Sequence, residues 1–362
     1  MDDFKKGEKS IESGRRKLFY IQLSRAIAIL FVLLGHVNIL FYTEFKYNWF
    51  HLGEWERTGG VDFFFTVTGF MIYYLYHRQA GIPGKTTEFF LKRVIRIYPL
   101  YWLFTLLTIA ASIIFPFIDE PYSFDLFIKS MLTLPTDPIL ASTWSLSYVM
   151  FFYIIFTAFI FKPKIFKPII FLWIVILILV ELKVIPNQGN SFFTSFSNLE
   201  ILFGCLVAHL TLNYRFRYSS LLIILGMSGF LAVWINNIYH LIELQTPIFY
   251  SLSSMILMLG ISEKDKKNRK VPKSLSFLGD ASYSIYIAHG PFLQFYILIF
   301  KKLDLMGSIG YFFSMSMVIL LAVFSSCLVY ILIEKPMSNF LRGVVFNRKK
   351  FTSIETVVKV VK

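Results

Sequence analysis

Long runs of apolar residues, separated by short polar segments, recur along almost the whole chain. Most are near the ~20 residues that a helix with a rise of ~1.5 Å per residue needs to cross a ~30 Å hydrocarbon core. The runs cover residues 18–42, 60–77, 97–118, 143–161, 168–182, 196–213, 220–238, 247–262, 276–300 and 310–334. The pattern therefore predicts an all-α polytopic membrane protein with about ten transmembrane helices. The fifth run is short enough to be tilted or partly re-entrant.

The composition agrees with this pattern and excludes a soluble fold. Of the 362 residues, 56% are hydrophobic, 19% are aromatic and only 16% are charged, with a mean hydropathy of +0.63. A soluble domain of this size does not carry such a composition. Cys205 and Cys327 both fall inside apolar runs, so the sequence indicates neither a disulfide framework nor a metal site.

The net charge of +14 follows from membrane topology and does not call for a nucleic-acid partner. If the N-terminus is cytoplasmic, most Lys and Arg fall in the N-terminal part, the cytoplasmic connections and the C-terminal part. The remaining connections hold only Lys46, Arg57, Lys129, Lys183, Lys301 and Lys302. By the positive-inside rule this bias places both termini in the cytoplasm.

Three parts follow from these boundaries. Residues 1–17 are polar and form a cytoplasmic extension, 18–335 form the transmembrane domain, and 336–362 form a basic cytoplasmic tail. Residues 1–17 do not resemble a secretory signal, because the charged region is long and no small-residue cleavage site follows the apolar run. Pro336 is expected to end the last helix at the cytoplasmic face.

The first helix contains two ionisable residues, Arg25 and His36. His36 lies ~16 Å further along the helix axis than Arg25, roughly half of the hydrocarbon thickness. A histidine at that depth usually faces a protein interior or a wet cavity and marks a functional site. A hydrogen bond from His36 to a neighbouring helix explains the pattern equally well.

Other ionisable residues fall within or near the later helices. His289 lies ~18 Å into the ninth helix if that helix starts near Phe277, so its depth matches that of His36. Glu200 lies inside the sixth helix, where an unpaired acid is costly. Asp62 lies near the outer end of the second helix, where it either caps the helix or orients a hydroxyl group or a partner histidine.

Basic and aromatic residues mark the two membrane faces. Arg93 and Arg96 are three residues apart at the cytoplasmic mouth of the third helix, so they share one helical face. Their guanidinium groups suit a phosphorylated ligand, although membrane anchoring explains them better on composition alone. Trp144, followed by Ser145, fits an interfacial aromatic belt, and a Trp ring also stacks on sugars.

Five separated stretches together resemble the signature of the acyltransferase family 3 integral-membrane acyltransferases, of the exopolysaccharide O-acetyltransferase type. The stretches are Arg25 to His36, GGVDFFFTVTGF, RVIRIYPLYW, TWSLSYVMFFY and LGDASYSIYIAHGP, with IEKPM as a weaker sixth. They run from the first helix to the last in the family's order. No additional extracytoplasmic hydrolase-like domain is present in this sequence.

The resemblance implies acyl transfer from cytosolic acyl-CoA, usually acetyl-CoA, to a hydroxyl of a cell-surface carbohydrate or its lipid-linked precursor. The acyl-CoA is a co-substrate, and no cofactor is expected to stay bound. By family pattern His36 and Arg25 are tied to activity, and Arg93 and Arg96 belong to the cytoplasmic motif. We expect neutral His36 to act as general base or to accept the acyl group.

The resemblance also suggests the surroundings of the reaction. Asp62, Trp144, Ser145, Glu200 and His289 would then serve the acceptor side or support the site. The implied location is the bacterial plasma membrane, with polysaccharide-synthesis machinery as a candidate partner.

One departure from the family pattern concerns Val149. The family usually has Glu at this position after Trp-Ser-Leu. The loss of a carboxylate could mean a changed acceptor, a role taken over by Glu200 or Asp62, or an inactive partner of a polysaccharide synthase. A glycan transporter or flippase shares the helix count and is the other alternative, but the paired broken helices typical of alternating access are not found.

Overall fold

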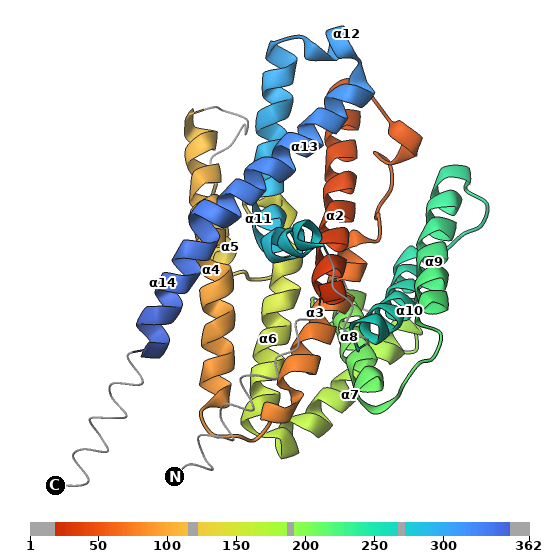
Figure 1. Cartoon of the computed structure of the whole chain (residues 1–362), viewed down its shortest axis with the longest axis vertical. Helices are drawn as coiled ribbons and strands as arrows, with labels where there is room; N and C mark the ends of the chain where they lie inside the picture. Colours follow the sequence, from red (N-terminus) through yellow and green to blue (C-terminus); the bar gives the residue numbers. More distant parts are fainter. Residues whose placement is uncertain (1–18, 115–121, 187–191, 267–271, 348–362) are drawn as a thin grey trace, which may run out of the picture.

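The computed structural model describes residues 19–114, 122–186, 192–266 and 272–347, and these residues contain helices and connecting segments but no strand. The ten long helices are α2 (Phe19–Phe45), α3 (Gly60–Tyr76), α4 (Lys85–Ile114), α6 (Ser145–Phe161), α7 (Pro163–Glu181), α8 (Phe196–Asn213), α9 (Ser219–Tyr239), α10 (Thr246–Lys266), α11 (Lys273–Lys302) and α13 (Tyr311–Val329) (Figure 1). Shorter helices are α5 (Phe124–Met131), α12 (Leu305–Ile309) and α14 (Lys335–Arg342). Each predicted apolar run forms a helix, and the all-α polytopic class is confirmed.

Eight helical segments within the described residues are long and apolar enough to cross a membrane, and α3 and α10 are not among them. Helix α3 has only 17 residues, and the end of α10 carries charged residues such as Glu263 and Asp265. Both helices bury about half of their residues against other helices, so they depend on protein rather than lipid contacts. Helix α7, with 19 residues, is among the eight segments, so the fifth run belongs to a helix long enough to cross a membrane.

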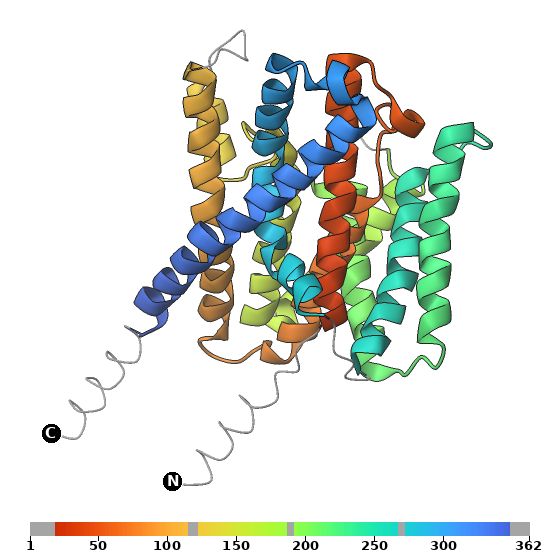
Figure 2. The same ribbon diagram turned by 45° about the horizontal axis from the view of Figure 1, so that its top comes forward.

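The described chain starts with α2 and finishes beyond α14 on the same side of the bundle (Figure 2). We call this side the basic side, because the Lys/Arg-rich connections predicted to face the cytoplasm lie there. The opposite side is called the far side. The predicted extension 1–17 and residues 348–362 of the predicted tail lie outside the described residues.

Helix α2 is central and packs on α3, α10, α11 and α13. Its contact with α11 is close on the basic side, where a Cβ added to Gly279 would lie 2.2 Å from the backbone oxygen of Gln22. Only glycine permits this approach. The crossing brings the start of α11, including Asp280, next to the turn of α2 that carries Gln22 and Arg25.

A second close crossing joins α3 to α8. A Cβ on Gly69 would lie 1.8 Å from the oxygen of Ile201, and one on Gly204 would lie 2.0 Å from the oxygen of Thr66. Small residues at such crossings let helix backbones touch, as is common in membrane bundles. The crossing holds the two helices together next to Asp62 and Glu200, which occur earlier on α3 and α8.

The prediction that Pro336 ends the last helix is wrong. Helix α13 continues through a π-helical turn, Tyr330–Glu334, into α14 and a further π-helical turn, Gly343–Asn347. Pro336 cannot donate a backbone hydrogen bond to the residue four positions earlier. The π-helical turn changes the hydrogen-bond spacing at that point, so the helix tolerates the proline. As a result, the first residues of the predicted tail form a helix at the basic side.

Candidate functional site

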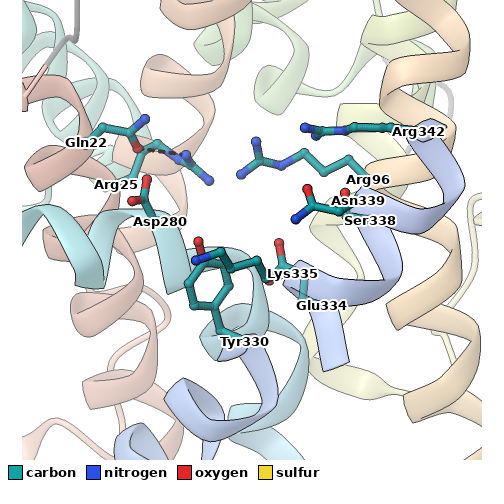
Figure 3. Close-up of a pocket in the computed structure, with 10 residues that line it drawn as sticks. All are labelled: Gln22, Arg25, Arg96, Asp280, Tyr330, Glu334, Lys335, Ser338, Asn339 and Arg342. Carbon is teal, nitrogen blue, oxygen red and sulfur yellow. Dashed lines mark hydrogen bonds between the residues drawn. The ribbon is translucent and has the colours of Figure 1, made fainter. Parts of the chain in front are cut away.

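A pocket of about 160 Å³ opens among α2, α4, α11 and α14 on the basic side, and we call it the mouth pocket. Its lining is almost entirely polar (Figure 3). The lining residues are Gln22, Arg25, Arg96, Asp280, Tyr330, Glu334, Lys335, Ser338, Asn339 and Arg342. Elements far apart in the sequence thus build one polar site at the end of the bundle.

Three arginines meet in the mouth pocket. Figure 3 shows the guanidinium groups of Arg25 and Arg96 pointing toward each other across it, with Arg342 beside Arg96. Arg25 donates a hydrogen bond of 3.0 Å to Gln22 Oε1. Within the described part of the chain, none of the three has a carboxylate oxygen within 4.0 Å. Like charges held together without partners favour an anionic ligand, such as a phosphate group.

The two acids of the mouth pocket do not cancel this charge. Glu334 accepts a hydrogen bond of 2.6 Å from the hydroxyl of Ser284 and is buried. Asp280 is exposed at the start of α11. With four cationic side chains and two carboxylates lining the pocket, its formal charge remains positive.

Sequence analysis missed the contribution of α14. Lys335, Ser338, Asn339 and Arg342 all line the mouth pocket. Their spacing of three, four and seven residues from Lys335 places them on one helical face, which is a signal visible in the sequence. A helix that ended at Pro336 would not contain this face.

A second pocket of about 80 Å³ adjoins the first and is called the inner pocket. Arg25 and Arg96 line both pockets, so they stand at the junction. The other lining residues are mostly apolar or aromatic: Phe64, Val67, Thr68, Met71, Ile72, Arg93, Ile97, Leu146, Val149, Tyr153, Ser282, Tyr283 and Tyr286. Val149, where the resemblance leads us to expect a Glu, lines this pocket.

Arg93 and Arg96 share the inner pocket, but only Arg96 reaches the mouth pocket. The guanidinium carbon of Arg93 lies 5.0 Å from the ring centre of Tyr76, 5.5 Å from that of Phe89 and 5.6 Å from that of Tyr153. Such an aromatic cage stabilises a cation without a counter-ion. The two arginines of the predicted motif thus have different surroundings.

The two histidines of matching depth meet. His36 on α2 and His289 on α11 have ring centres 5.1 Å apart. His289 is fully buried, and its Nδ1 lies 2.8 Å from the backbone oxygen of Tyr286 and 3.0 Å from that of Ile285. The pair lies one helical turn beyond Tyr286, the last α11 residue of the inner pocket. Both pockets and the histidine pair therefore follow one another along α2 and α11.

Ser145 and Trp144 are adjacent in the sequence but contact different residues. The Ser145 hydroxyl is 2.9 Å from that of Tyr286, so Ser145 supports the wall between the inner pocket and the histidine pair. Trp144 packs edge-on against Phe65 and Tyr148. It belongs to an aromatic cluster and makes no contact with either histidine in the described residues.

Asp62 and Glu200 form a separate cluster with Arg57, a residue that sequence analysis did not single out. Arg57 Nη1 lies 3.2 Å from Asp62 Oδ1 and 3.9 Å from Glu200 Oε1. Ser251 donates a hydrogen bond of 3.1 Å to Glu200 Oε1. Burial disfavours the charged form of Arg57, but the two carboxylates outweigh this effect and raise its pKa. The cluster places two acids around one cation, and neither acid contacts His36.

No group of three or more His, Cys, Asp or Glu able to hold a metal ion occurs in the described ranges. The chemistry available at the site is that of arginine, tyrosine, serine and the two histidines. The inner pocket would separate an anion bound in the mouth pocket from the imidazole rings of His36 and His289. This order suits a molecule with a charged end and a reactive end.

Comparison with known proteins gives two matches and one negative result. Residues 18–333 match the model of a family described as an acyltransferase domain. The chain is also similar to the exopolysaccharide production protein ExoZ of Rhizobium meliloti (strain 1021), with 25% identity over 305 residues, which covers 78% of this chain and 92% of that protein. No solved structure matches the chain.

Proposed function

The chain belongs to acyltransferase family 3, and we propose that it is an O-acyltransferase that moves an acyl group, most simply acetyl, from acyl-CoA to a hydroxyl of an exopolysaccharide or its lipid-linked precursor. The name of the similar Rhizobium protein supports exopolysaccharide as the acceptor class. The family match covers residues 18–333, from α2 through α13, which supports placing the reaction within these helices.

The observation that carries this proposal is the order of the mouth pocket, the inner pocket and the histidine pair along α11, from Asp280 through Tyr283 to His289. Arg25, Arg96 and Arg342 supply unpaired positive charge for the phosphates of coenzyme A. The inner pocket is narrow and mostly apolar, which suits the thioester end of the donor. His36 and His289 lie beyond it, where an acceptor hydroxyl would meet the acyl carbon.

The chemistry needs a base at the histidine pair. His36 takes the proton of the acceptor hydroxyl as its oxygen bonds to the acyl carbon. The bond between that carbon and the sulfur of coenzyme A then breaks, and the proton passes from His36 to the thiolate. Arg25 lies on the same helix but lines the pockets on the basic side, which supports a role in donor binding rather than proton transfer.

The orientation follows from the same arrangement. We propose that the basic side faces the cytosol of a bacterium and that the bundle lies in the plasma membrane. Acyl-CoA then enters from the cytosol, while the glycan approaches from the far side. This arrangement also agrees with polysaccharide-synthesis machinery as a partner.

Val149 is the specific observation in favour of a second candidate, an inactive partner of such machinery. The residue faces the inner pocket, where the family's usual Glu would stand among Arg25, Arg93 and Arg96. The inactive candidate predicts that wild-type protein transfers no acyl group from any donor.

The test is acyl transfer from radiolabelled acetyl-CoA by purified protein in lipid vesicles that contain the glycan acceptor. Wild type should label the glycan or the protein, and His36→Ala should lower turnover by about 10²-fold or more. His240→Ala is the matched control, because His240 is exposed after the end of α9. A carrier would move glycan regardless of His36, and a protein that is inert with several acyl-CoA donors would refute the enzyme.

A further inference from the structure

His289 is the buried histidine to which the reaction described above assigns no step. It is 0% exposed and lies on α11 opposite His36 of α2. The α11 segment before it packs tightly on α2, beginning at Gly279 and Gln22. The position of the His289 ring relative to His36 is therefore set by the packing of two long helices.

The hydrogen bonds of His289 define which ring nitrogen carries its proton. Its Nδ1 is within 3.0 Å of two backbone oxygens, those of Tyr286 and Ile285. Carbonyl oxygens only accept hydrogen bonds, so Nδ1 must be the N–H. In the neutral ring, Nε2 then carries the lone pair and can only accept.

The lone pair on Nε2 of His289 has no hydrogen-bond donor in the described part of the chain. Nε2 of His289 is buried and has no hydrogen-bond partner among the described residues. Buried polar atoms of this kind are rare, because leaving them unpaired is unfavourable. The ring centre of His36 lies 5.1 Å from that of His289, and the structure has no hydrogen bond between the two rings. A turn of the His36 ring that points one of its N–H groups at Nε2 would bring the two nitrogens within hydrogen-bond distance.

From this geometry we infer that His289 is a positioning residue for His36: its Nε2 accepts a hydrogen bond from one N–H of His36. The other nitrogen of His36 is then left with its lone pair facing the acceptor hydroxyl. The inference rests on the proposed function for its consequence in catalysis. His289 stays neutral throughout, while its hydrogen bond stabilises His36 after His36 has taken the hydroxyl proton.

Two substitutions of His289 distinguish a role in positioning His36 from a role in filling space. His289→Leu removes the acceptor nitrogen, whereas His289→Gln keeps a polar acceptor of similar reach. We expect His289→Leu to lower kcat about 10- to 100-fold, the range found for groups that orient a functional histidine, with the KM for acetyl-CoA unchanged. His289→Gln should recover a large part of that loss, and His240→Gln should behave as wild type.

Other outcomes overturn the inference. Equal loss in the two His289 variants would mean that the ring acts by filling space. A raised KM for acetyl-CoA with unchanged kcat would assign His289 to donor binding. Elution as a single monodisperse species in size-exclusion chromatography shows that each compared variant is folded.

A measurement without turnover separates this inference from the proposed function. The chain has only 6 His, so nitrogen-15 NMR of histidine-labelled protein can follow individual rings, assigned by single substitutions. His36 should show one tautomer in wild type and in His289→Gln, and a mixture in His289→Leu. If wild type transfers no acyl group, the proposed function fails while this spectrum still tests the pairing. If the His36 tautomer ignores His289, the pairing fails even in an active enzyme.

Discussion

Two arginine-containing clusters lie in different parts of the bundle, and their charges are balanced in different ways. In the mouth pocket, Arg25, Arg96 and Arg342 have no carboxylate within ion-pair distance in the described residues. Arg57, by contrast, lies 3.2 Å from Asp62 and 3.9 Å from Glu200. One cluster has an excess of cations, while the other has two acids for a single cation.

The difference separates ligand binding from structural support. A cation that already has acidic partners gains little from a further anion, and removing one member of a buried ion pair is strongly destabilising. Cations held together without partners repel one another until an anion binds between them. We therefore assign donor binding to the mouth pocket and helix packing to the Arg57 cluster. The predictions below test this division, starting with the largest expected effect.

Removal of Arg57 should have the largest effect, and it should act on stability. Arg57→Met leaves the carboxyl groups of Asp62 and Glu200 buried without their cation. We expect the free energy of unfolding to fall by about 3–5 kcal/mol. Thermal denaturation in detergent measures the change.

A matched variant tests the cause of that loss. Arg57→Met combined with Asp62→Asn and Glu200→Gln removes all three formal charges and should restore most of the stability. Acetyl-CoA binding by this triple variant should equal that of wild type. A triple variant as unstable as the single one would show that Arg57 acts by packing and not by charge.

Substitution in the mouth pocket should affect binding and leave stability unchanged. Arg25→Gln and Arg96→Gln each remove a charge-assisted hydrogen bond to a donor phosphate, worth about 1.5–3 kcal/mol. The dissociation constant of acetyl-CoA should rise about 10- to 100-fold, as measured by equilibrium binding to purified protein. A large fall in the unfolding temperature without this change in affinity would contradict the comparison.

The sequence predicted the helices and much of the mouth pocket. Apolar runs mark all ten long helices, and eight helical segments of the described residues are long and apolar enough to cross a membrane. Arg25 and Arg96 stood out because charged residues are costly near or inside a membrane. The equal depth of His36 and His289 was visible in the sequence, but their contact depends on the packing of α2 against α11.

Other features depended on tertiary packing that no local pattern contains. Arg57 lies in a loop, and only the folded chain shows that it neutralises Asp62 and Glu200. Arg93 looked equivalent to Arg96 by spacing, yet aromatic rings enclose it. The helix beyond Pro336 depends on the π-helical turn before it, a backbone change that sequence reasoning did not anticipate.

Arg342 should have a smaller effect than Arg25 or Arg96. It is exposed at the end of α14, so water and salt screen its charge. Arg342→Gln should raise the dissociation constant of acetyl-CoA about 3- to 5-fold at low salt, a change below ~1 kcal/mol. The difference should shrink in 0.5 M NaCl. The exposed Arg217→Gln is the control, and an equal effect there would indicate general attraction rather than a site.

Val149→Glu should have the smallest effect, and it tests the comparison by adding an acid beside arginines that have no ion-pair partner in the described residues. The new carboxylate would face Arg25, Arg93 and Arg96 in the inner pocket. We expect the dissociation constant of acetyl-CoA to rise by less than about 3-fold, since the acid neutralises part of the local charge but does not enter the mouth pocket. Val149→Gln controls for size.

The turnover of the Val149→Glu variant distinguishes an active enzyme from an inactive partner. In an active enzyme that tolerates Val149, turnover should change little, because His36 and the donor pockets are intact. Turnover by Val149→Glu together with a wild type that is inert would mean that the reaction needs a carboxylate the natural chain lacks. The arginines that face Val149 would then lack a carboxylate partner that the reaction requires. The inactive-partner function would in that case replace the proposed acyltransferase function.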